Sequence, residues 1–158
     1  MAKSDNLDAI LARLDSDDSS CRDVAAAEIG DLMEVDYLNA KDYRKVVKKL
    51  LAAVRQESDW NAKESMFDAL SFASSSKHAG AINWDPIARS LDDLDVACLE
   101  HALIILGDSG DAKYKARIRP YLHHPDETIA TTAADALKTI DWKQRQGPQV
   151  QPHAGKRT

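Results

Sequence analysis

One pattern recurs four times along this sequence, and every copy begins with an aspartate. The four aspartates are Asp18, Asp59, Asp95 and Asp126. In each copy, the residues 3, 7, 8 and 11 positions after the aspartate are small or apolar. Because these offsets trace one side of a helix of about 3.6 residues per turn, each copy is predicted to form an amphipathic helix. The aspartate stands where an N-cap residue accepts hydrogen bonds from the free N–H groups of the first turn.

A second amphipathic stretch precedes each aspartate. Apolar residues at helical spacing mark three of these stretches, at 7–14, 46–54 and 114–122. The remaining one is short, and there Asp85 is predicted to cap a helix with Pro86 in its first turn. Each unit is therefore a predicted helix pair, helix A followed by helix B. Such pairs bury their apolar sides by stacking, so the predicted fold is all-α, an α-solenoid of about four pairs.

Parts of the sequence resemble HEAT repeats. Segment 18–30, which reads DSSCRDVAAAEIG, is similar to the second helix of a repeat, in particular to the HEAT-like repeats first named from phycobilisome lyases. Segment 102–111, ALIILGDSGD, resembles the junction between two repeats, and segment 123–126, HHPD, resembles the turn within one. The family's arginine, four positions after the aspartate, is present only as Arg22, with Lys63 as a partial substitute. The resemblance covers roughly residues 5–142 and implies HEAT-like helix pairs.

Length and composition favour one domain. The chain has 158 residues, of which 44% are hydrophobic and 30% charged, a balance typical of a soluble globular protein. We expect a repeat domain over residues 1–142 and a flexible tail over 143–158, where proline, glycine and glutamine dominate. No apolar run approaches the ~20 residues of a membrane helix, and no secretory signal is visible. Cys21 and Cys98 occupy packing positions, as reduced thiols of a cytoplasmic protein would.

Acidic residues gather on the side of the B helices that is predicted to face away from the core. Of the twelve residues at offsets 5, 9 and 13 from the four aspartates, seven are acidic and none is basic. These seven, called the acidic face below, are Asp23, Asp31, Glu64, Asp68, Glu100, Asp108 and Asp135. Trp60 and Phe72 are candidate apolar contacts beside them, as is Ile104. The HEAT-like resemblance implies that B helices line the concave side of the solenoid, so the acidic face is expected to be concave.

The predicted A helices carry the opposite charge, with five cations in 41–49 and four in 113–119. An acidic surface repels nucleic acid and attracts a basic protein. We therefore predict a non-enzymatic protein-binding module whose partner is a basic protein. One concrete form is an inhibitor or immunity protein that neutralises a toxin or nuclease. The competing interpretation is a solvated acidic surface without a partner.

The sequence offers little for catalysis, a metal ion or a cofactor. His123 and His124 lie near Asp126 and Glu127, but adjacent residues in a turn point in different directions, so no metal site is predicted. No glycine-rich phosphate loop is present. The alternative left open is a lyase-like enzyme, or an enzyme accessory, that handles a chromophore or small ligand on the same fold. That function would require an apolar pocket with convergent polar groups.

Overall fold

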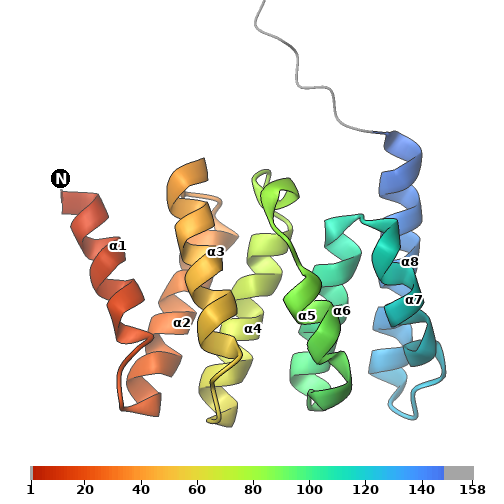
Figure 1. Ribbon diagram of the computed structural model, residues 1–158, viewed down its shortest axis with the longest axis horizontal. Helices are drawn as coiled ribbons and strands as arrows, with labels where there is room; N and C mark the ends of the chain where they lie inside the picture. The colour runs from red at the N-terminus through yellow and green to blue at the C-terminus, as the bar shows by residue number, and fades with distance from the viewer. Residues whose placement is uncertain (1, 148–158) are drawn as a thin grey trace, which may run out of the picture.

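The computed structural model describes residues 2–147, which are helical apart from turns and loops. Its α-helices form four consecutive pairs, and Figure 1 shows these pairs side by side in one row. The pairs are α1 (Ala2–Arg13) with α2 (Ser19–Glu34), α3 (Ala40–Val54) with α4 (Trp60–Ser74), α5 (Asp85–Ser90) with α6 (Val96–Ser109), and α7 (Lys115–Ile118) with α8 (Glu127–Gln146). The predicted all-α fold of stacked helix pairs is confirmed. No helix within the described residues is long and apolar enough to cross a membrane.

The helices lie in two layers with one hydrophobic core between them. The B layer consists of α2, α4, α6 and α8, and each of these helices packs directly on the next. The A layer consists of α1, α3, α5 and α7, and each of these helices packs on the B helix of its own pair. Most of the apolar residues that recur in the B helices are buried at this boundary, as Ala26, Phe67 and Leu103 illustrate, whereas Cys21, Ala134 and Leu137 are half-buried. The stacking therefore follows from the repeated apolar pattern.

All four repeated aspartates are N-caps, as predicted. The side chain of Asp18 accepts a hydrogen bond from the N–H of Ser20, and those of Asp59 and Asp95 accept from residues three positions on. The carboxylate of Asp126 accepts two such bonds, from the N–H groups of Thr128 and Ile129. Each cap satisfies N–H groups that have no partner inside the helix. The start of every B helix is thus determined locally.

The prediction that Asp85 caps α5 is wrong. Its N–H donates to Oδ1 of Asn83 (3.0 Å), and Asp85 is itself the first residue of the helix. Its carboxylate accepts a hydrogen bond from the Tyr114 hydroxyl (2.8 Å) and pairs with Lys113 (2.9 Å), both in the next unit. Pro86 does lie in the first turn, as predicted. Asp85 therefore links α5 to the next helix pair and does not cap α5.

The fourth A helix is broken. The predicted stretch 114–122 consists of the end of a 3-10 turn (Ala112–Tyr114), the four-residue α7, and a second 3-10 helix (Arg119–His123). Pro120 explains the break, because proline has no N–H to continue the α-helical hydrogen bonds. At the other end of this unit, α8 continues to Gln146, beyond the predicted domain boundary at residue 142. Residues 148–158 of the predicted tail lie outside the described part of the chain.

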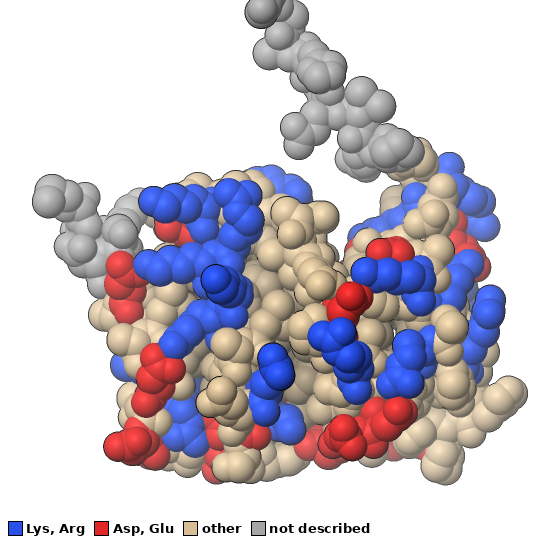
Figure 2. Space-filling model, in the orientation of Figure 1, with Lys and Arg blue, Asp and Glu red and all other residues tan. Residues whose placement is uncertain are grey.

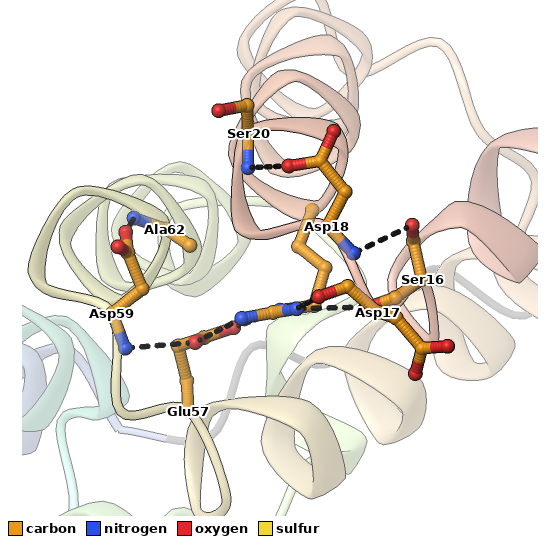
Figure 3. Close-up of polar contacts among 8 residues, drawn as sticks. Ser16, Asp17, Asp18, Ser20, Glu57, Asp59 and Ala62 are labelled. Atoms are coloured by element: carbon orange, nitrogen blue, oxygen red, sulfur yellow. Dashed lines mark hydrogen bonds and ion pairs between the residues drawn. The ribbon is translucent and has the colours of Figure 1, made fainter.

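A clamp between Arg22 and Glu57 joins the first two units (Figure 3). The guanidinium of Arg22 donates to both carboxylate oxygens of Glu57, at 2.6 and 2.9 Å, and the Glu57 side chain is only 2% exposed. Arg22 also donates to the carbonyl oxygens of Ser16 and Asp17, and Glu57 accepts from the N–H of Asp59. The clamp therefore holds the turn between α1 and α2 against the turn between α3 and α4.

Two glycines at the same position of the repeat, twelve residues after the capping aspartate, differ in the room around them. A Cβ on Gly30 would meet Ala69 at an ordinary 3.8 Å, whereas one on Gly107 would lie 2.8 Å from the Ala136 Cα. We expect Gly107→Ala to lower the free energy of unfolding by ~1–3 kcal/mol, because α6 and α8 must separate. Gly30→Ala should be neutral or stabilising by up to ~1 kcal/mol, because alanine favours the helix. Urea unfolding of both variants checks this, and equal losses would contradict the described packing.

The clamp also predicts a pH dependence. The Arg22 guanidinium lowers the pKa of Glu57, so this carboxylate stabilises the fold above about pH 4.5 and ceases to do so as the pH falls through its folded-state pKa. We expect Glu57→Gln to lower the melting temperature by several degrees at pH 7 and by less at pH 3. Glu34 is exposed and has no ion pair with a described residue, so Glu34→Gln is the control and should show no such difference. A Glu57→Gln effect that is the same at both pH values would contradict this assignment.

Candidate protein-binding face

The acidic face lies along all four B helices, on the side that faces away from the hydrophobic core. Its members lie on α2 (Asp23, Asp31), α4 (Glu64, Asp68), α6 (Glu100, Asp108) and α8 (Asp135). Asp31 and Asp135 are exposed, and the other five are half-buried. Since neighbouring B helices pack directly on each other, the structure brings the predicted residues onto one continuous surface.

Three carboxylates of the acidic face contact a neighbouring B helix. Asp23 accepts a hydrogen bond from the Ser65 hydroxyl (2.5 Å), and Asp108 accepts one from the Ser74 hydroxyl (3.0 Å). An Asp68 carboxylate oxygen lies 3.9 Å from Nδ1 of His101. The two hydrogen bonds hold Asp23 and Asp108 in fixed positions across the boundaries between helices, whereas Nδ1 of His101 has no hydrogen-bond partner among the described residues. The sequence analysis did not predict these contacts. Ser65 and His101 both lie six residues after their capping aspartates, so they occupy the same position of the repeat.

Positive charge within the described residues does little to balance this surface. The side chains of Asp31, Glu64 and Glu100 make no hydrogen bond or ion pair there, and Asp135 pairs with Lys138 at 3.2 Å. That pair is solvent-exposed and separated by three residues on one helix, a kind that contributes little. The acidic face therefore carries an excess of negative charge.

The apolar contacts near the acidic face differ from those predicted. Trp60, the first residue of α4, is 54% exposed and remains a candidate contact. Phe72 instead packs against the core beside Gly30 of α2, so it mainly fills space between two B helices. Ile104 is exposed as expected, and Val24, which the sequence reasoning missed, is 50% exposed next to Asp23. Val24 and Ser65 both lie six residues after their capping aspartates. This shared position is the sequence signal that could have identified Val24 as an exposed contact.

The A layer carries the positive charge, as predicted. Figure 2 shows Lys and Arg side chains gathered over α3 and over the region from α5 to α7. Some of these cations pair with acidic residues, as Lys49 does with Asp15 and Arg117 with Asp92. Lys41, on α3, makes no side-chain hydrogen bond or ion pair with a described residue. Opposite charges therefore occupy the two layers.

The A helices are separated by clefts, whereas the B helices are in contact. Clefts of about 490, 340 and 230 Å³ lie between α1 and α3, between α3 and α5, and between α5 and α7. On the B side, the close approach of Gly107 to Ala136 illustrates the tight packing of α6 on α8. A wide A layer on a narrow B layer favours curvature toward the B layer. This spacing supports the expectation that the acidic face is the inner surface.

The residues with catalytic or metal-binding chemistry are dispersed. No three His, Cys, Asp or Glu side chains among the described residues are placed to hold a metal ion. His124 is part of its turn, where Nδ1 accepts a hydrogen bond from the N–H of Asp126 (3.1 Å). Both cysteines are free, and burial raises the pKa of the Cys98 thiol to about 12. Cys98 is therefore a neutral packing residue at physiological pH.

Comparisons with known proteins support the fold. No protein-family model matches the sequence, and no curated protein matches it significantly. Among solved structures, the chain is similar to the crystal structure of an engineered protein determined by the Northeast Structural Genomics Consortium. The TM-score is 0.69 at 17% sequence identity, and the match covers 85% of this chain and 62% of the other, so this chain spans less than two thirds of that protein. A likeness at this identity shows the all-α helical repeat fold alone.

Proposed function

We propose that this chain is a protein-binding module of the HEAT-like type whose acidic face binds a basic protein. One observation carries the proposal: six of the seven carboxylates have no lysine or arginine ion-pair partner among the described residues. Such a surface attracts a basic partner over a distance and raises the rate of association. The proposal makes binding, and not catalysis, the role of the B layer.

The dimensions and the rigidity of the acidic face also support binding. Four packed helices spaced ~8–10 Å apart present a row of about 30 Å, long enough for one side of an ordinary protein interface. The contacts of Asp23 with Ser65 and of Asp108 with Ser74 fix carboxylates in place before a partner arrives. Less conformational entropy is then lost on binding. Exposed Trp60 would contribute the apolar contact at which binding energy concentrates.

The most concrete form of this function is that of an inhibitor or immunity protein acting in the cytoplasm. A row of fixed carboxylates resembles the spaced negative charges of a nucleic-acid backbone. It would therefore occupy the nucleic-acid-binding surface of a basic toxin or nuclease. The two free cysteines are compatible with a reducing compartment.

Charge reversal tests the proposal. We expect the wild-type chain to retain a basic protein at low salt and to release it as salt rises, because salt screens exposed charges. Glu64→Lys with Glu100→Lys should weaken binding to that protein about tenfold or more without changing helicity, since neither side chain makes a hydrogen bond or an ion pair with a described residue. Asp17→Lys with Asp93→Lys changes the net charge equally, outside the acidic face, and should bind normally. The measurement is affinity capture with mass spectrometry, followed by calorimetry on the captured protein.

Two results would contradict the proposal. One is binding that is indifferent to reversal at Glu64 and Glu100, and the other is an affinity that does not change with salt. A captured pigment or small molecule would favour the second candidate, a lyase-like enzyme or enzyme accessory. The observation in favour of that candidate is the cleft between α3 and α5, which combines apolar walls with charged groups.

A further inference from the structure

The cleft between α3 and α5, called the α3–α5 cleft below, is a second candidate site on the opposite layer from the acidic face. It lies between the fifteen-residue α3 and the six-residue α5. Residues of α3 form one wall, α5 and the 3-10 turn after it (Leu91–Asp93) form the other, and α4 contributes the floor. Its volume is about 340 Å³. Clefts of ~300–1,000 Å³ are typical of sites for small molecules.

Part of the lining of the α3–α5 cleft is apolar. Val54, Phe67 and Ile87 are buried side chains that line it, and Leu51 and Leu94 are half-buried beside them. A ligand that covers these side chains would remove apolar surface from water, which favours binding by ~25 cal/mol per Å² before other costs. The floor therefore suits a hydrocarbon or aromatic body.

The same lining is also positively charged. Arg55, Lys63 and Arg89 line the α3–α5 cleft, with Asp93 as the one acidic residue in it. None of the three cations makes a hydrogen bond or an ion pair with a described residue. An anion entering the cleft would thus meet donors that no carboxylate of the described chain already occupies.

Lys63 distinguishes this cleft from an ordinary basic surface. It is half-buried, and every other half-buried cation among the described residues has an acceptor. These pairs are Arg13 with Glu28, Arg22 with Glu57, Lys49 with Asp15, Lys115 with Asp141, and Lys143 with the carbonyl oxygen of Asp108. An ammonium group that is partly removed from water favours a nearby anion, because a charge-assisted hydrogen bond replaces lost solvation.

The repeat explains why Lys63 has no acceptor. Arg22 and Lys63 both stand four residues after their capping aspartates, and Glu57 and Asp93 both stand two residues before theirs. Arg22 and Glu57 form the clamp, but no ion pair joins Lys63 to Asp93. Aspartate is one methylene shorter than glutamate, and lysine lacks the fork of arginine. The second pair therefore forms no clamp, and the Lys63 ammonium is left without an acceptor among the described residues.

We propose that the α3–α5 cleft binds a small amphipathic carboxylate. Its carboxylate group accepts hydrogen bonds from Lys63 and from the flanking Arg55 and Arg89, and its apolar body lies on Phe67 and Ile87. The charge complementarity and the apolar floor together specify this ligand, since a simple anion uses only the cations and a neutral hydrocarbon only the floor. A free small molecule fits better than an acidic peptide, because walls on two sides enclose a volume near the lower limit for ligand sites. This site does not depend on the acidic face.

Three probes of matched design test the proposal by NMR titration of the whole ¹⁵N-labelled chain. Sodium octanoate has both the carboxylate and the apolar body, 1-octanol has only the body, and inorganic phosphate has only the charge. We expect octanoate to bind about tenfold or more tightly than either of the other two, with amide shifts concentrated at residues 51–55, 63–67 and 87–94. Equal binding of 1-octanol or phosphate, or shifts outside the cleft, would overturn the proposal. Stronger binding of a capped acidic peptide than of octanoate would overturn it in favour of a peptide site.

Variants show which charges matter. Lys63→Gln removes the charge but keeps the first part of the aliphatic stem, and it should weaken octanoate binding about tenfold while leaving 1-octanol binding unchanged. Arg89 is exposed, so Arg89→Gln tests the same charge effect without risk to the fold. It should weaken octanoate binding several-fold. Lys41→Gln, elsewhere on the A layer, is the matched control and should have no effect. Octanoate affinity that is unchanged in both Lys63→Gln and Arg89→Gln, or reduced equally in Lys41→Gln, would overturn the proposal.

Discussion

The direct packing of the four B helices on one another is the constraint on which the rest of this structure depends. Each B helix packs directly on the next, and between α6 and α8 the approach is so close that a Cβ on Gly107 would lie 2.8 Å from the Ala136 Cα. This packing places the outward-facing carboxylates of consecutive helices on one surface. It also leaves the A helices farther apart than the B helices, so clefts open between them. Both proposed sites are consequences of this difference in spacing.

The B helices could be predicted from the sequence because the forces that define them are local. An aspartate caps the first turn, and the apolar residues that follow have helical spacing, so both signals lie within about twelve residues. The A helices were harder to predict. Asp85 looked like a cap, but Tyr114 and Lys113, almost thirty residues away in the sequence, bind its carboxylate. Contacts with the neighbouring helix pair therefore decide the role of Asp85, and the local sequence pattern does not.

The two candidate sites also differ in how far the sequence predicts them. Helical periodicity alone was sufficient to predict that Glu64, Glu100 and the other carboxylates face away from the core. It could not show that Ser65 binds Asp23, because the rotation of one helix against its neighbour sets that contact. The α3–α5 cleft was still less accessible to prediction. It depends on the spacing of α3 and α5 and on the absence of an ion pair between Lys63 and Asp93, both of which appear only when the units are stacked.

The central claim is that the acidic face, and not the basic A layer or the ends of the row, is the surface that recognises a basic partner. The most direct measurement is a map of where a defined polycation binds, by NMR titration of the ¹⁵N-labelled chain with an octalysine peptide at low salt. The account predicts that the largest amide shifts lie along the exposed side of α2, α4 and α6, around Asp31, Glu64 and Glu100. Shifts spread evenly over all exposed carboxylates, including Asp17 and Asp93, would contradict it.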